Sequence, residues 1–126
     1  MPEPQPAIAT PAPRLPPPQT LTIAFDVNSS YFPDSLNGRL RSLASSLRPD
    51  QAYAIELIGS IGNDPVANGA PEDAAAYNRW IAERRVDRIA DFLRANAKVT
   101  NLAIERAYAR NDPSRRVTVK VRPLQP

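Results

Sequence analysis

The chain has 126 residues, with 16 basic and 13 acidic side chains and a formal net charge of +3. It contains no Cys and no His, which excludes disulfide scaffolds, Cys/His zinc sites, thiol nucleophiles and imidazole-based triads. The mild positive charge permits an anionic partner without requiring one.

The N-terminal segment is unusually rich in proline. Fifteen residues are Pro, and eight of these lie within residues 1–18. Proline has no backbone N–H and a fixed φ, so this segment favours extended polyproline II. We expect a linker or tail over residues 1–19, with a PxxP-type ligand as the alternative. One domain over residues 20–122 and a short tail over 123–126 complete the division.

The first half of the domain reads as strand, helix, strand. Residues 21–27 alternate between apolar and polar or small side chains, which predicts a strand with one buried face. A helix opens near Pro33, with Asp34 or Ser35 as its N-cap, and ends before Pro49. Residues 53–58 are almost continuously apolar, which is typical of a central strand.

The second half reads as a long helix and two strands. Residues 59–69 form a loop, and a helix runs from about residue 71 to 95, opened by Pro71 and two acids. Strands are predicted over 101–109 and 116–121, paired as an antiparallel hairpin. The order βαβαββ predicts an α+β fold, a four-stranded mixed sheet covered by two helices.

Two polar residues of the long helix fall within its apolar stripe. On a helical wheel, Asn78 and Arg85 lie among the apolar positions and two turns apart. A buried Arg is costly unless it is paired and hydrogen-bonded, so we expect Arg85 to find an anion. That anion is either an internal carboxylate, such as Asp26 or Asp64, or the carboxylate of a ligand, which an Arg binds bidentately.

The outer face of this helix carries interleaved charges and one Trp. Acids and arginines at three- and four-residue spacing are typical of a solvated, self-compensating face, with a nucleic-acid-binding stripe as the alternative. Trp80 points away from the apolar stripe, and an exposed Trp suggests a partner contact.

Several segments together resemble the OmpA-like peptidoglycan-associating domain over roughly residues 20–122. They are a strand ending in FDVNSS, a leucine-rich helix, a strand ending at Gly59, the helix segment YNRWIAERRVDRIADFL, and the final SRRVTVKV. Members of this family mostly reside in the periplasm of Gram-negative bacteria. They hold the diaminopimelate of the peptidoglycan peptide stem between a loop Asp and a helix Arg.

The resemblance implies roles for individual residues. The family Arg corresponds to Arg85 and the family Asn to Asn78, while Arg115 and Arg116 match the terminal Arg pair. The loop Asp has no counterpart, because Gly62 stands at its position, and Asp64 substitutes only if the loop shifts by two residues. The small residue after the family Arg is here Val86, which is expected to narrow the pocket.

The sequence therefore predicts a non-catalytic envelope module that contacts peptidoglycan weakly through Arg85, Asn78, Asp64 and Arg116, without cofactor or metal. The alternative is a degenerate OmpA-like domain that scaffolds other envelope proteins, for example through Trp80 in a secretion or conjugation system. An enzyme is the third reading, because paired acids can cleave glycosides, but no nucleophile–base set is present. A periplasmic location follows from the resemblance alone, with any membrane contact through an anchor outside this chain.

Overall fold

The computed structural model describes residues 15–26, 29–31, 34–63 and 71–124. The elements follow the order β1 (Gln19–Ala24), α2 (Asp34–Ser46), β2 (Tyr53–Ser60), α3 (Pro71–Asn96), β3 (Leu102–Ala109) and β4 (Arg116–Pro123). The predicted α+β class and βαβαββ order are confirmed.

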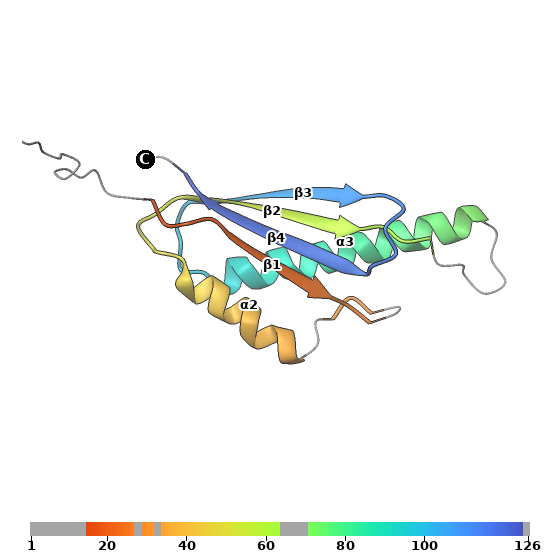
Figure 1. The fold of residues 1–126 in the computed structure, drawn as a ribbon, viewed down its shortest axis with the longest axis horizontal. Coiled ribbons are helices and arrows are strands. Elements are labelled where there is room, and N and C mark those ends of the chain that lie inside the picture. The colour runs from red at the N-terminus through yellow and green to blue at the C-terminus, as the bar shows by residue number, and fades with distance from the viewer. Residues whose placement is uncertain (1–14, 27–28, 32–33, 64–70, 125–126) are drawn as a thin grey trace, which may run out of the picture.

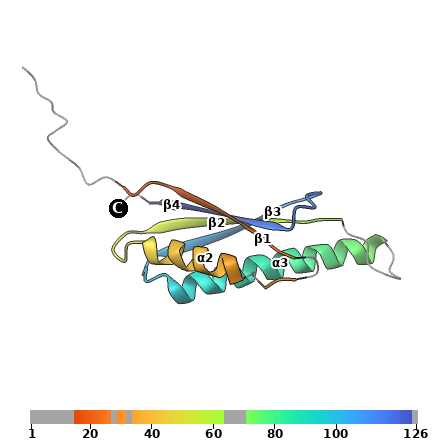
Figure 2. The same cartoon turned by 60° about the horizontal axis from the view of Figure 1, so that its bottom comes forward.

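The molecule has two layers, as Figures 1 and 2 show: a four-stranded sheet and two helices packed on one of its faces. The strand order is β1-β4-β2-β3, with β2 parallel to β3 and β4 antiparallel to both β1 and β2. The core fills the space between the layers. Its fully buried side chains include Ile23, Leu40, Ile55, Leu57, Ile89, Leu93, Val117 and Val119.

The last two strands do not form the predicted hairpin. β4 lies between β1 and β2, whereas β3 pairs with the other edge of β2. In β4 the three valines of one face, Val117, Val119 and Val121, are all buried. The described β3 is only partly buried and carries exposed charges at Glu105 and Arg106. The better-covered strand takes the interior position, and the more polar strand takes the edge, where charged side chains protect against pairing with other chains.

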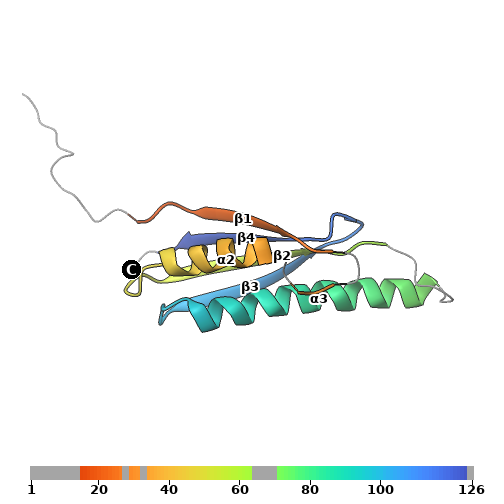
Figure 3. The same ribbon diagram turned by 90° about the horizontal axis from the view of Figure 1, so that it is seen from below.

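The two helices differ in length and in how they lie on the sheet. In α2, the buried stripe consists of Leu40, Leu43 and Ala44. The helix ends at Ser46, three residues before Pro49, because a proline disfavours the helical conformation of the residue before it. The longer α3 crosses under the sheet, and its first turns project beyond the strand ends (Figure 3). Neither described helix is long and apolar enough to cross a membrane.

Helix α3 approaches β2 very closely at Gly59. A Cβ built on Gly59 would lie 2.8 Å from Cγ2 of Val86 and 3.3 Å from Cδ1 of Tyr108. The absence of a side chain on Gly59 is therefore what lets the fully buried Val86 rest on the strand. Val86 is larger than the small residue of the OmpA-like pattern, and its side chain fills the helix–sheet interface over Gly59.

Candidate functional site

Arg85 is buried, as the wheel predicted, with 4% of its surface exposed. Its Nε donates to the backbone carbonyl of Ser29 at 2.8 Å, and Nη2 donates to the backbone carbonyl of Asp26 at 3.1 Å. The guanidinium carbon lies 5.3 Å from the ring centroid of Phe25. Backbone oxygens thus supply part of the compensation that the sequence led us to expect from carboxylates, and Arg85 fastens the segment after β1 to α3.

A second arginine, one turn further along α3, holds the same segment. Nε of Arg88 donates to Oγ of Ser30 at 2.8 Å, and its guanidinium carbon lies 3.8 Å from the ring centroid of Tyr31. Ser30 is itself buried. Two arginines of α3 therefore position the segment that follows β1. Arg85 binds its backbone carbonyls, and Arg88 binds the hydroxyl of Ser30 and stacks on the ring of Tyr31.

Asn78 is also buried, and it faces the position where the resemblance places an acid. Nδ2 of Asn78 donates to the carbonyl of Ala74 at 2.7 Å. A Cβ built on Gly62 would lie 3.7 Å from Oδ1 of Asn78, 3.6 Å from Cα of Pro113 and 3.8 Å from the carbonyl of Asp112. These are ordinary van der Waals distances, and Gly62 does not have a positive φ. A Cβ therefore fits at position 62, beside Asn78.

Two backbone hydrogen bonds of the preceding residue, Ile61, hold Gly62 in position. The amide of Ile61 donates to the carbonyl of Ala109 at 2.8 Å, and the carbonyl of Ile61 accepts from Asp112 at 2.9 Å. The strand end of β2 is thereby tied to the β3–β4 connection. Asp64, the other predicted acid, lies outside the described residues.

Arg116 lies on the other face of the sheet from Arg85 and Asn78. Along β4, Arg116 and Thr118 alternate with the core valines, so they point to the face without helices. There Arg116 lines a small hollow of about 250 Å³, together with residues that include Ser60, Asp112 and Ser114. The amide of Arg116 donates to Oγ of Ser60 at 2.8 Å. Arg85 and Asn78 are thus both buried on α3, two turns apart, whereas Arg116 lies on the opposite face of the sheet.

Two titrating groups near this end of the sheet have shifted pKa values. The hydroxyl and the amide of Ser114 lower the pKa of the Asp112 carboxyl, and nearby Arg116 adds to the effect. Burial raises the pKa of the Tyr108 hydroxyl, and Asp87 and Glu83 add to that shift.

Trp80 is exposed, as predicted, and it belongs to a larger patch. Half of its surface is exposed, and Tyr31 is 68% exposed. The guanidinium of Arg84 lies 5.3 Å from the Trp80 ring, and Arg88 stacks on Tyr31. Sequence reasoning missed Tyr31, Arg84 and Arg88. The available signal was an i, i+4, i+8 row of Trp80, Arg84 and Arg88 along one helix face.

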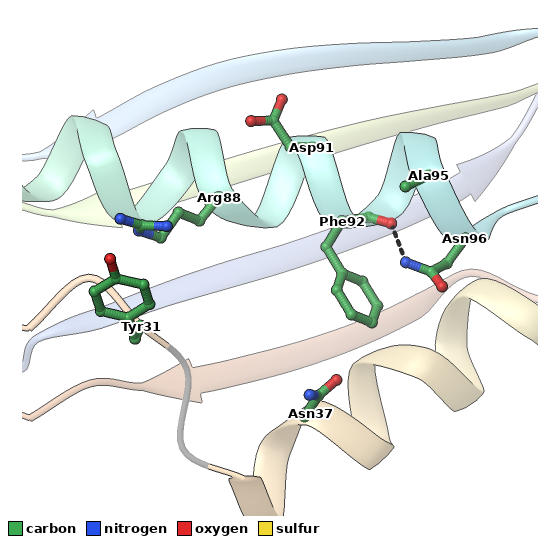
Figure 4. Close-up of a pocket in the computed structure, with 7 residues that line it drawn as sticks. All are labelled: Tyr31, Asn37, Arg88, Asp91, Phe92, Ala95 and Asn96. Atoms are coloured by element: carbon green, nitrogen blue, oxygen red, sulfur yellow. Dashed lines mark hydrogen bonds between the residues drawn. The ribbon is translucent and has the colours of Figure 1, made fainter.

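A second hollow continues this patch along α3. It measures about 470 Å³ and is lined by Tyr31, Asn37, Arg88, Asp91, Phe92, Ala95 and Asn96. Figure 4 shows Tyr31 and Arg88 side by side at one end and Phe92 between the two helices. No group of three or more Asp or Glu side chains within the described ranges is placed to hold a metal ion.

A comparison of the sequence with protein-family models gave no match, and neither did a search of curated proteins. The relation to OmpA-like domains therefore stays a prediction, drawn from the residues quoted above.

Proposed function

We propose that this domain is a non-catalytic binding module that contacts the peptide stem of peptidoglycan at the end of the sheet where β2 finishes. The observation that carries the proposal is the placement of Gly62 directly beside Asn78, with Arg85 two turns along the same helix. Three positions that the OmpA-like pattern assigns to one pocket thus lie on neighbouring elements. A periplasmic location and the absence of catalysis are part of the same proposal.

Binding through this site is expected to be weak, because glycine replaces the acid that would face the ligand ammonium. Loss of the charged partner of a desolvated pair costs about 2–5 kcal/mol. That cost lowers a micromolar affinity, about −8 kcal/mol, toward the millimolar range. A polymer that offers many stems compensates by raising the effective concentration around a tethered domain.

Restoration of the missing acid provides the test. The variant Gly62→Asp places a carboxylate where a Cβ meets only ordinary contacts, and Gly62→Asn is a neutral control of nearly the same size. We expect Gly62→Asp to bind a soluble diaminopimelate-containing muropeptide at least tenfold more tightly than wild type, and Gly62→Asn to leave the affinity unchanged. The measurement is an NMR titration of ¹⁵N-labelled protein.

A second muropeptide tests whether Arg85 recognises the ligand carboxylate or whether binding reflects nonspecific charge attraction. A muropeptide with lysine in place of diaminopimelate lacks one carboxylate, so it should bind more weakly than its diaminopimelate counterpart. Equal affinities for the two ligands, or no gain in Gly62→Asp over Gly62→Asn at millimolar ligand, would contradict the proposal.

The second candidate function is a scaffold that joins envelope proteins and does not bind peptidoglycan. The half-exposed Trp80, with Tyr31 and two arginines beside it, favours this alternative. A flat muropeptide titration for both wild type and Gly62→Asp is the result it predicts.

A further inference from the structure

We infer that Tyr31, Trp80, Arg84 and Arg88 form a docking site for a short acidic segment of a partner protein. We call these four residues the cationic aromatic patch. The inference deepens the scaffold alternative, since it names the chemistry of the partner. It does not depend on the peptidoglycan site, because none of the four residues is Asn78, Arg85 or Gly62.

The first supporting observation is the distribution of charge along α3. The two acids that lie between the patch residues of the helix are engaged elsewhere: Glu83 pairs with Arg79 at 3.2 Å, and Asp87 pairs with Arg106 of β3 at 3.1 Å. Within the described ranges, Arg84 and Arg88 have no carboxylate within ion-pair distance. Two positive charges, one helical turn apart, therefore make no ion pair within the described residues, although Asp91 lines the neighbouring hollow with Arg88.

The second observation is that aromatic rings hold both guanidinium groups in place. Arg84 lies over Trp80 at 5.3 Å, and Arg88 lies over Tyr31 at 3.8 Å and also donates to Ser30. A guanidinium stacked on a ring still presents its N–H edge to an incoming carboxylate. Because these contacts already restrict the two arginine side chains, we expect less conformational entropy to be lost when a partner binds.

The third observation is the hollow that these residues enclose. It has a volume of about 280 Å³ and is lined by Ser29, Ser30, Tyr31, Trp80, Ile81, Arg84 and Arg88. Apolar ring faces and Ile81 lie beside the two cations, so the hollow suits an apolar side chain next to acidic ones. Trp, Tyr and Arg are also the residues that most often carry binding energy in protein interfaces.

Charge complementarity favours an acidic peptide over a nucleic acid. Nucleic-acid binding usually rests on many phosphate contacts, and it is strengthened by basic surroundings. The cationic aromatic patch offers only two arginines, and acids such as Asp87 and Asp91 lie exposed on the same helix. A short segment with two carboxylates can satisfy both arginines without meeting those acids.

Trp80 is the only Trp of the chain, so its fluorescence reports on the patch directly. The test is a titration of the full chain with a capped heptapeptide, Glu-Asp-Glu-Phe-Glu-Asp-Glu, at low salt. The matched control is the same peptide with Gln and Asn in place of the acids. We expect the acidic peptide to change Trp80 emission with an affinity at least tenfold higher than that of the neutral peptide, and to weaken steeply at about 150 mM salt.

Variants locate the site. We expect Arg84→Gln to weaken the acidic peptide about threefold, and Arg84→Gln with Arg88→Gln about tenfold. Arg94→Gln makes the same charge change at an exposed position further along α3 and should leave the affinity unchanged. Since Arg88 also holds Ser30, the exposed Arg84→Gln keeps the test valid if the double variant is poorly folded.

Three results would overturn the inference. They are equal affinity for the acidic and neutral peptides, equal losses from Arg94→Gln and Arg84→Gln, and tighter binding of a single-stranded oligonucleotide than of the acidic peptide. Each of these is distinct from a failed muropeptide titration, which concerns Gly62 and Arg85 alone.

Discussion

The close contact between Gly59 and Val86 predicts a steric coupling between strand and helix. In the variant Gly59→Ala, the new Cβ would lie 2.8 Å from Cγ2 of Val86, about 1 Å inside the usual carbon–carbon separation. β2 is paired on both edges and Val86 is fully buried, so neither group can move away freely. Overpacking of this kind costs about 1–3 kcal/mol.

A smaller, opposite effect must be subtracted from that cost. Replacing Gly by Ala lowers the entropy of the unfolded chain and stabilises a protein by about 0.4–1 kcal/mol where the backbone permits it. The net prediction for Gly59→Ala is a loss of about 0–2.6 kcal/mol in the free energy of unfolding, centred on about 1.3 kcal/mol. For a domain of about 105 residues this central value lowers Tm by about 5–10 °C.

A double-mutant cycle isolates the contact. Val86→Ala alone should cost about 2 kcal/mol, since it removes two buried methyl groups and leaves a small cavity. In the double variant the new methyl group at position 59 enters that space, so the combined loss should fall short of the sum by about 1–2 kcal/mol. Urea unfolding followed by far-UV circular dichroism measures each free energy.

Gly38→Ala is the matched control. Gly38 lies in α2, and a Cβ built there meets nothing within 4 Å, so this change should stabilise the domain by about 0.5–1 kcal/mol. The reasoning is refuted if Gly59→Ala behaves like Gly38→Ala, or if the Gly59 and Val86 losses are additive within about 0.5 kcal/mol.

Two further predictions concern Arg85 and Asp112. Arg85→Met removes the side-chain donor to the carbonyls of Asp26 and Ser29, and among the described residues the Asp26 carbonyl then keeps only the amide of Ser29. We expect a loss of about 2–4 kcal/mol in urea unfolding, and a loss below about 1 kcal/mol would argue that Arg85 does not hold this segment on α3. The folded-state pKa of Asp112 is lowered by Ser114, so its contribution to stability is present above the unfolded pKa of about 4 and disappears as pH falls through the folded pKa. An NMR titration of the side-chain carboxyls should give Asp112 a midpoint below that of an ordinary Asp, and Ser114→Ala should move it upward; a midpoint at or above the ordinary value contradicts the assignment.

The sequence contained enough information for the elements and for the burial of two polar residues. Helical periodicity placed Asn78 and Arg85 in the stripe that packs on the sheet, and the structure confirms this burial. Periodicity describes one element at a time, however. It did not reveal that the carbonyls of Asp26 and Ser29 face Arg85, because those atoms come from a connection with no repeating pattern.

The pairing of the strands was harder to predict from the sequence than the positions of the strands. A connection of a few residues between β3 and β4 suits a hairpin, which is why residues 101–109 and 116–121 were expected to pair. The burial pattern agrees with the observed order, since β4, with three buried valines, lies between β1 and β2, and the less buried β3 lies at the edge. The exposed charges of β3 were visible in the sequence and favoured an edge position.

The strand order also has a consequence for how the chain folds. In the described part of the chain, β1 pairs with β4 alone, so the first strand has no partner until the last strand is available. The unit β2–α3–β3 is local in sequence and can form earlier, but it leaves one edge of the largely apolar β2 open. Until β4 pairs with it, that edge is open to another chain, so we expect the domain to be most exposed to aggregation before β4 has docked.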